Sequence, residues 1–407
     1  MKTRRGISSP LRGEEIKKLF SKGVEMKKLR LFGTIGIILL VGILMLSCTP
    51  AGTTSQAPAP PSSKPASSTA AAPASDSAQE PAWQKVIEAA RKEGKLNLYS
   101  FSMVGDIGLQ VSKAFENRYG LKVDIITGRG AEFIERIKTE ERLNQVTADI
   151  MDGSSTHTFN LKAAGATVST LDIPVLREKN VWRVDPLAAD PEGHLLVQRS
   201  HNISTWINTN LIKPGQEPKS FRDLAKPEWK GKILLPDPSV STSSLIVFLP
   251  LVDRGYLDME FIRSLKDQDL KFVTGTPDIV RALSRGEMPL GLGASDTDAA
   301  PFLAEGAPFK AIALEEGTVA NVNPGVVVKG APHPNTAKLF TNWILGVEGQ
   351  TVYTRALGLA SIRKDVSDFR HPNSVVNPKR LIIVTDEDIQ RQAKAFRDKV
   401  LVDMWRR

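Results

Sequence analysis

The chain has 407 residues, one cysteine and a formal net charge of +9. Ten of its 54 Lys and Arg and three of its 45 Asp and Glu precede Cys48, so 44 basic and 42 acidic side chains follow it. Because these later charges nearly balance and no basic stripe is interleaved with aromatic residues, a nucleic-acid-binding surface is not expected. The single cysteine also excludes a disulfide within the chain.

The segment before Cys48 has the pattern of an export signal. A basic segment at 27–30 precedes an uncharged, largely apolar run that ends at Ser47. A basic start, an apolar stretch and a small residue at the cleavage point make up a secretory signal. With a cysteine next, the segment resembles a bacterial lipoprotein signal. This resemblance implies that 1–47 is removed and that Cys48 is diacylated on its sulfur. The chain would then be anchored to the cell membrane on its extracytoplasmic (periplasmic or extracellular) face.

Details of this segment leave alternatives open. Small residues are common two places before a lipidated cysteine, and Leu46 stands there. The alternative is a buried free cysteine at the end of an uncleaved membrane helix, although the charge-free run 31–47 is at or below the shortest length that spans a bilayer. Residues 1–25 fit no signal pattern, and Met26, followed by Lys-Lys-Leu-Arg, is the expected start of translation.

Residues 48–81 are expected to form a disordered tether. From Thr49 to Pro81 there is no Ile, Leu, Val, Met or aromatic residue, and Ala, Pro, Ser and Thr predominate. Such a segment cannot bury enough apolar surface to offset its chain entropy. Its prolines favour extended conformations of about 3 Å per residue, so it would reach up to roughly 100 Å.

The folded part, from about Trp83 onward, begins with alternating helix and strand patterns. Apolar periodicity and glycine positions predict helices at 83–92, 106–119 and 131–145. The predicted strands are 96–100, 121–127 and 148–152. This order predicts an α/β fold with a mostly parallel sheet.

The alternation resumes after an extended segment at 194–208. Helix starts are predicted at Ser220 (with Asp223 completing the cap), at Thr276 before Pro277, at Asn335 and at Thr385. These helices would end at Gly231, near Gly286, at Leu345 and at Arg406, and a strand is predicted at 289–293. At about 325 residues the folded part exceeds the usual limit of one hydrophobic core, so two lobes are expected.

Five segments resemble one known family. They are GKLNLYS at 94–100, FENRYGLKV at 115–123, TGRGAE at 127–132 with the helix that leads to Ala148-Asp149, FRDL at 221–224 through WKGKILLPDP at 229–238, and NPGVVV at 323–328 with APHPNTAKLF at 331–340. In order and spacing they resemble the solute-binding lipoproteins of bacterial ABC importers, in the branch that includes ferric-iron-binding proteins.

This resemblance implies a two-lobed periplasmic-binding-protein fold of type 2, with mixed sheets flanked by helices and a ligand cleft between the lobes. Lobe 1 would comprise 83–197 and 318–365, and lobe 2 would comprise 198–317 and 366–407. The crossing strands would fall near 194–204 and 314–319. The implied function is the substrate-binding component of an ABC transporter: a monomer without cofactor or enzyme activity that captures a small solute and delivers it to permease subunits.

Strand ends indicate where a solute would bind. In open α/β sheets ligands bind beyond the carboxyl ends of strands, where loops lead into helices. Hydroxyl-rich loops at helix N-termini suit anions, and Arg129 between two glycines would add a bidentate contact. The alternative is that the hydroxyl residues only cap helices and that Arg129 is a solvated loop charge. The candidates are Tyr99, Ser100, Ser102, Arg129, Asp152, Ser154 and Ser155 in lobe 1, and Asp237, Ser241, Thr242, Ser295 and Asp296 in lobe 2.

The resemblance also raises the question of iron. Ferric sites in that family pair two adjacent tyrosinates from lobe 2 with a histidine and a carboxylate from lobe 1, and hard oxygen ligands suit Fe(III). Here residues 295–301 stand where the tyrosine pair is expected, and Phe101 or Ser102 stands near the histidine position. A small anion or a metal–organic complex is therefore favoured over direct ferric binding. A metal or a cationic solute such as a polyamine remains an alternative, and its ligands would be the carboxylates of Asp152, Asp237, Asp296 and Asp298.

Three alternative functions remain. A solute sensor that docks a receptor would share the fold, and so would a protein that binds ferric iron directly. An exported hydrolase would need a nucleophile such as Ser154 or Ser243 with one of the five histidines. No G-x-S-x-G, H-E-x-x-H or Walker-type glycine loop is present, so the sequence predicts no catalysis.

Overall fold

The computed structural model describes residues 80–238 and 243–385. The chain divides into two contact units, 1–70 and 71–407, and the first lies wholly outside the described residues. The expected lipoprotein signal, Cys48, Ser241, Thr242, the helix expected at 386–406 and nearly all of the tether also lie outside them. None of the described helices combines the length and the apolar character needed to cross a bilayer.

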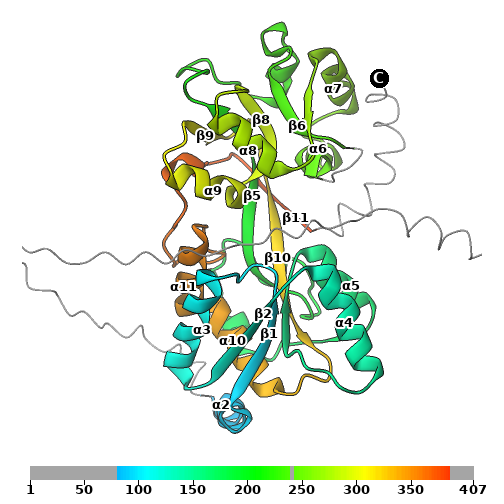
Figure 1. Ribbon diagram of the computed structural model, residues 1–407, viewed down its shortest axis with the longest axis vertical. Coiled ribbons are helices and arrows are strands. Elements are labelled where there is room, and N and C mark those ends of the chain that lie inside the picture. Colours follow the sequence, from blue (N-terminus) through cyan, green and yellow to red (C-terminus); the bar gives the residue numbers. More distant parts are fainter. Residues whose placement is uncertain (1–79, 239–242, 386–407) are drawn as a thin grey trace, which may run out of the picture. The chain divides into compact units, whose positions relative to one another are not determined.

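The first half of the described chain alternates helices with strands (Figure 1). The helices are α2 (Pro81–Glu93), α3 (Asp106–Tyr119), α4 (Gly130–Arg142), α5 (Ser155–Ala163) and the 3-10 turn η2 (Pro174–Arg177). The strands are β1 (Lys95–Ser100), β2 (Lys122–Thr127), β3 (Ile150–Asp152) and β4 (Thr167–Val168). Gly94 and Gly120 end α2 and α3 with φ values of 78° and 72°, a left-handed geometry that favours glycine at a helix C-terminus.

Two long strands follow and bracket a second group of elements. They are β5 (Leu196–Asn208) and β10 (Thr318–Val328). Between them lie η3 (Phe221–Ala225), η4 (Pro227–Trp229), β6 (Ile233–Pro236), α6 (Ser243–Asp253), α7 (Met259–Ser264), η5 (Leu265–Gln268), β7 (Lys271–Val273), α8 (Thr276–Ser284), β8 (Leu290–Ser295), α9 (Asp296–Ala304) and β9 (Phe309–Ile312). After β10 come α10 (Pro334–Leu345), α11 (Val347–Leu357), η6 (Pro372–Ser374) and β11 (Leu381–Val384).

The strands form one mixed sheet in the order β2-β1-β3-β10-β5-β8-β6-β7. β1 pairs in parallel with β2 and β3, whereas β10 is antiparallel to both β3 and β5. β11 pairs with the start of β10, and β9 pairs with the end of β5. β5 and β10 therefore run from one group of helices to the other (Figure 1). The predicted α/β fold, with a mixed sheet flanked by helices, is confirmed. The mostly parallel sheet predicted from the order of elements is wrong, because β5 pairs antiparallel with β8, β9 and β10, and β10 pairs antiparallel with β3 and β4.

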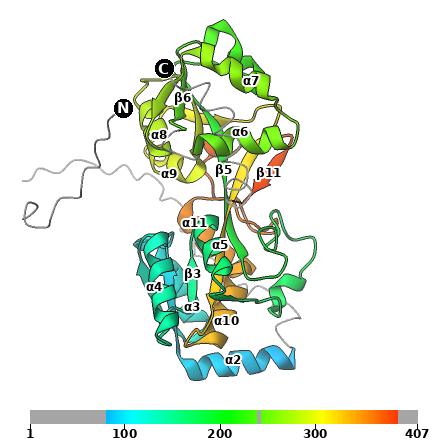
Figure 2. The ribbon, with the colours of Figure 1, turned by 90° about the vertical axis from the view of Figure 1, so that its right-hand side faces the viewer.

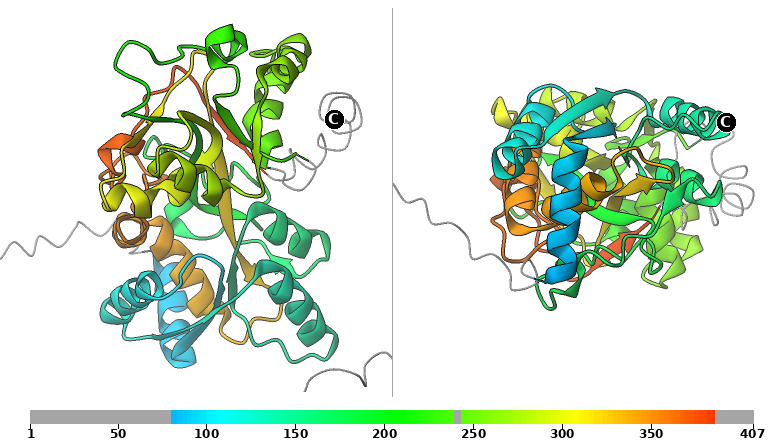
Figure 3. Two further views of the ribbon diagram at one scale, coloured as in Figure 1. Left: turned by 45° about the horizontal axis from the view of Figure 1, so that its top comes forward. Right: turned by 90° about the horizontal axis from the view of Figure 1, so that it is seen from below.

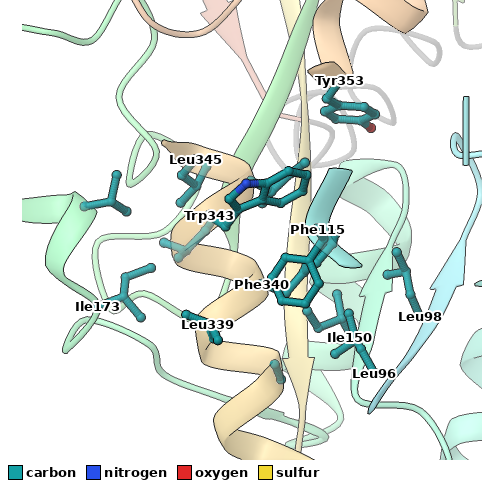
Figure 4. Close-up of a cluster of buried hydrophobic side chains, with 14 of the residues drawn as sticks. Leu96, Leu98, Phe115, Ile150, Ile173, Leu339, Phe340, Trp343, Leu345 and Tyr353 are labelled. Carbon is teal, nitrogen blue, oxygen red and sulfur yellow. The ribbon is translucent and has the colours of Figure 1, made fainter. Parts of the chain in front are cut away.

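Each group of helices has its own apolar core. In lobe 1, α2 packs along α10 (Figures 2 and 3), and Phe115, Phe340 and Trp343 meet with ring centroids 5.1–5.7 Å apart (Figure 4). In lobe 2, the core joins α6 to β6, β8 and the 3-10 turns. Ile382 of β11 packs into this second core as well.

The second crossing strand extends further than the predicted 314–319, because β10 continues to Val328. Its pairing with β5 is interrupted between Asn323 and Pro324, and Gln198 on β5 has no partner at this bulge. Proline has no N–H to donate to a ladder, so a bulge opposite Pro324 lets the strand continue. Because proline is rare inside strands, the sequence did not predict that this strand continues past Pro324.

Several predicted boundaries are wrong for local reasons. The segment after Ser220 forms two 3-10 turns rather than one helix, because Pro227 interrupts it; the Ser220–Asp223 capping box itself is present. α4 ends three residues before Gln145. Asn335 does not cap α10, which starts at Pro334, and its side-chain amide instead donates to Glu93 at 2.7 Å.

The strand predicted at 148–152 begins only at Ile150. The carboxylate of Asp149, just before it, accepts the Asn97 N–H and the His333 N–H, each at 2.7 Å, and its Oδ2 lies 2.8 Å from His333 Nδ1. Burial raises the pKa of Asp149, and these bonds oppose the rise. Asp149 thus ties β1 to the segment that starts α10.

Candidate solute site

Three parallel strands of lobe 1 end side by side. Ser100 of β1 pairs with Thr127 of β2 and with Asp152 of β3, so the three carboxyl ends are in register. Each strand leads through a short loop into the N-terminus of α3, α4 or α5. This edge is where open α/β sheets bind ligands, and helix N-termini present N–H groups that suit anions.

Arg129 lies at this edge as the N-cap residue of α4. Its side chain is exposed and makes no hydrogen bond or ion pair with another described residue. Gly130 beside it allows the starts of α4 and α5 to touch, because a Cβ at Gly130 would lie 2.2 Å from Nδ1 of His157. The backbone at Arg129 is therefore held in place while its guanidinium stays accessible to solvent.

The start of α5 carries the other serines predicted from the third strand. Ser154 is the N-cap residue, and its Oγ lies 2.8 Å from His157 Nδ1. Ser155, the first residue of the helix, is buried. The Ser154–His157 contact is the kind of pair that the hydrolase alternative needs. The two residues are three apart in the first helical turn, where such a contact is ordinary local geometry.

Ser100, Ser102 and Asp152 come together as predicted neighbours, but they bind one another. The Ser100 hydroxyl donates to Asp152 Oδ2 at 2.6 Å, and the Ser102 hydroxyl donates to the same oxygen. Ser100 also accepts the Met103 N–H at 2.9 Å. Asp152 is fully buried, and its second oxygen, Oδ1, has no hydrogen-bond partner among the described residues.

Tyr353 of α11 also contacts this group, and the sequence did not predict it. Its hydroxyl lies 2.7 Å from Ser102 Oγ, and Figure 4 shows its ring at the top of the lobe 1 core that contains Trp343. Burial raises the pKa of Tyr353, the nearby Asp152 adds to the rise, and Arg199 opposes it. Nothing in the sequence around Tyr353 marks it, because α11 reads as an ordinary amphipathic helix.

Tyr99 is placed away from the strand-end residues. Side chains alternate across a strand, so Tyr99 and Ser100 point to opposite faces of the sheet. The Tyr99 hydroxyl contacts Thr147 Oγ1 at 2.7 Å and donates to Glu140 at 3.1 Å, and its ring packs on Phe133. The structure gives Tyr99 a packing role in lobe 1, and we leave it out of the site.

The lobe 2 candidates have different surroundings. Ser295 forms a capping box with Asp298 at the start of α9, which is the helix-cap alternative. Asp237 follows β6, is partly buried, and donates its N–H to Val273. Ser241 and Thr242 lie outside the described residues.

Asp296 is the most unusual carboxylate in lobe 2. It is 2% exposed, and one of its oxygens has no partner among the described residues. The other oxygen accepts the Asn202 N–H at 3.3 Å and lies 4.0 Å from Arg370 Nη1. Burial raises the pKa of Asp296 to about 7, against the opposing charge of Arg370.

A ferric site of the tyrosinate type needs two adjacent ionised tyrosines, and no two of the four tyrosines of this chain are adjacent in the sequence. Among the described residues no three His, Cys, Asp or Glu side chains are grouped to hold a metal. Burial raises the pKa of Tyr99, Tyr119 and Tyr353, which disfavours their ionised forms. The fourth tyrosine, Tyr256, lies 4.7 Å below the Arg380 guanidinium.

Two surface grooves of lobe 2 lie elsewhere. They have volumes of about 460 and 800 Å³ and share Glu217, Pro218 and Lys219. The larger one reaches Lys232 and Pro289, which directly precede β6 and β8. These are the amino ends of parallel strands, opposite the edge where ligands bind, and no candidate residue lines either groove.

Comparison with known proteins identifies sequence relatives and similar structures. Iron uptake protein A1 of Synechocystis is 24% identical over 278 residues, which cover 65% of this chain and 75% of that one. A Trichodesmium IdiA (FutA) structure with iron and citrate aligns with a TM-score of 0.61 and 22% identity, covering 77% of this chain and 99% of that one. AfuA of Actinobacillus pleuropneumoniae, with fructose-6-phosphate bound, aligns at 0.54 and 19%, covering 76% and 99%.

These structural likenesses establish the fold, which in the neighbours is the two-lobed fold of periplasmic binding proteins. The family assignment rests on a longer match, because residues 96–356 fit the profile of one family from β1 through α11. The matched stretch includes both crossing strands, β5 and β10, and all the elements between them. This chain belongs to the bacterial extracellular solute-binding proteins.

Proposed function

We propose that this chain is the substrate-binding component of an ABC importer and that its solute is a small anion or an anionic metal–organic complex. The main support is the lobe 1 edge where the N-termini of α3, α4 and α5 follow three strand ends in register. Each N-terminus carries a partial positive charge worth about 0.3–1 kcal/mol to a nearby anion. The exposed Arg129 adds a full charge at the same edge.

The solutes of similar structures support the same class. The Trichodesmium protein was solved with iron and citrate, and AfuA with fructose-6-phosphate. Both citrate and the sugar phosphate carry oxyanion groups. Iron held within such a complex needs no tyrosinate from the protein, which suits a chain whose buried tyrosines resist ionisation. Direct ferric binding is therefore the weaker alternative.

We also propose that Cys48 is lipidated and that residues 48–81 tether the binding domain to the extracytoplasmic face of the membrane. The support is the sequence pattern before Cys48 and the composition of 49–81. The physical purpose would be to keep the captured solute near the permease. A tethered receptor searches a small volume, so its effective concentration at the permease rises.

A thermal-shift panel of anions, metal ions, polyamines and organic acids tests the proposal. A solute at a hundredfold excess over its dissociation constant stabilises the folded state by about 2.7 kcal/mol, so an anion should raise the melting temperature by several degrees. Arg129→Ala should weaken this response. The matched control is Arg142→Ala, because Arg142 is an exposed arginine at the opposite end of α4.

Two results would count against the proposal. If both arginine variants weaken the thermal shift equally, Arg129 acts only through net charge. If no anion shifts the melting temperature, the solute is not an anion. Cellular uptake separates import from sensing, since an importer component is needed for solute uptake and a sensor is not. For the hydrolase alternative, turnover that disappears in Ser154→Ala would replace the binding proposal.

A further inference from the structure

Arg199, on the crossing strand β5, is a buried cation without a matching anion. It is 4% exposed, and its Nε has no hydrogen-bond partner among the described residues. No described carboxylate forms an ion pair with it. Burying a charge without such compensation is expensive, so an arginine in this state calls for a partner that the chain alone does not supply.

Three residues near Arg199 also have buried polar atoms without hydrogen-bond partners. Asn323 stands opposite Arg199 on β10, is 3% exposed, and its Oδ1 has no partner in the described part of the chain. Gln198 is 1% exposed, and both of its amide atoms lack partners there. Asp152 contributes its free Oδ1. Buried polar groups are nearly always hydrogen-bonded, so four such residues together point to a missing ligand or water.

Strand register places these groups in one row. Asp152 pairs with Gly325, and Asn323 lies two residues before Gly325 on the same face of β10. Gln198 packs against Gly325 so closely that a Cβ there would lie 2.1 Å from its Nε2. Tyr353 is near the row as well, because its hydroxyl lies 2.7 Å from Ser102 Oγ and both Asp152 and Arg199 influence its pKa. The row meets the solute edge at Ser102, which is bonded to both Asp152 and Tyr353.

Another buried arginine of the described chain serves as a contrast. Arg363 is also fully buried, but it donates to Asp365, to Glu178 and to the Leu345 carbonyl. Its charge is balanced within the protein, as expected of a structural arginine. Arg199 interacts with the neutral Tyr353 hydroxyl, and no described carboxylate balances its charge.

We propose that Arg199 binds the anionic group of the solute, and that Asp152, Asn323 and Gln198 bind hydroxyl groups on the same molecule. The solute class is then a hydroxylated organic anion, such as a hydroxycarboxylate or a sugar phosphate. This inference rests on the proposed function and narrows it. Arg199 repels a bare metal cation, and Asp152 repels an inorganic anion that has no hydroxyl donor to offer. A solute with both an oxyanion and hydroxyl groups satisfies both residues.

Isothermal titration of the full chain with citrate, fructose-6-phosphate, sulfate (a dianion without an O–H donor) and uncharged fructose tests the inference. A hydroxylated anion should bind at least tenfold more tightly than sulfate or fructose. Arg199→Met should weaken its binding by roughly 10- to 100-fold, the range for a lost charged hydrogen bond, and Arg199→Lys should weaken it less. Asp152→Asn should reduce the preference for the hydroxylated anion over sulfate.

Arg363→Met is the matched control, and it should lower the melting temperature without changing the dissociation constant. If Arg199→Met does not fold, Arg199→Lys and Asn323→Ala are titrated instead, and both should bind the hydroxylated anion more weakly than the wild type. Unchanged affinity in the folded variants would overturn the inference, and the row would then be a hydrated structural layer. Tight binding of a metal ion or a polyamine, with no binding of hydroxylated anions, would overturn it while leaving solute capture in place.

Discussion

Asp296→Asn should change how the stability of this protein depends on pH. The Asp296 carboxyl is buried, and its pKa rises from an ordinary 3.8 to about 7 in the folded state. Between these values the unfolded chain loses the proton first, so the free energy of unfolding falls as pH increases. Below about pH 4 both states hold the proton, and above about pH 7 the full cost of a buried charge is present.

The size of this effect follows from the pKa shift, which burial causes and nearby charges modify. A difference of about three pH units corresponds to roughly 4 kcal/mol at 1.36 kcal/mol per unit. Arg370 lowers this pKa, and Asp368 raises it slightly. Asp296 is also the first residue of α9, and the helix dipole stabilises a charge there by up to about 2 kcal/mol. The expected loss of stability from pH 4 to 8 is therefore about 2–4 kcal/mol more in the wild type than in Asp296→Asn.

Urea denaturation at pH 4, 6 and 8 measures this difference. Asp258→Asn provides a control of opposite sign, because the Phe261 N–H and Arg222 lower the pKa of Asp258. Asp258 therefore contributes stability above its unfolded pKa, and this contribution is lost as the pH falls through the folded value. Parallel stability curves for the wild type and Asp296→Asn would refute the reasoning.

Three further changes test packing and anchoring. Gly130→Ala should destabilise the protein by about 1–3 kcal/mol, because its Cβ would meet His157, and adding His157→Ala should recover part of this loss in chemical denaturation. Trp343→Ala should cost about 3–5 kcal/mol by the same measurement, since it empties the lobe 1 core beside Phe115; a smaller loss would mean that the core collapses around the gap. Cys48→Ser should move the protein from the membrane to the soluble fraction with unchanged solute affinity, and membrane retention would contradict the anchor.

The site is only partly readable from the sequence. Ser100, Ser102 and Asp152 are predictable because they follow strands, and the carboxyl ends of parallel strands share one edge. Their mutual hydrogen bonds are not predictable, since residues 100 and 152 meet only when β1 and β3 pair. Tyr353 and Arg199 come from distant elements and carry no local pattern that marks them.

Tyr99 illustrates the opposite error. It adjoins the strand end in the sequence, yet the alternation of side chains turns its ring to the other face of the sheet, toward Phe133. Which face meets the site depends on where the covering helices pack. Sequence position alone therefore could not separate Tyr99 from Ser100.

Local sequence patterns were sufficient to predict part of this structure. Apolar periodicity and C-terminal glycines predicted most helices of lobe 1, and the alternation of helix and strand patterns predicted the order of its strands. Because most of the excess basic charge precedes Cys48, the sequence also argued against a nucleic-acid-binding surface. Only the tertiary structure decided that β10 runs on through Pro324 and that Gln198, Arg199, Asn323 and Asp152 face one another without satisfying their polar groups. Pairing across β3, β10 and β5 joins residues far apart in the chain, and burial then determines which of them need a partner.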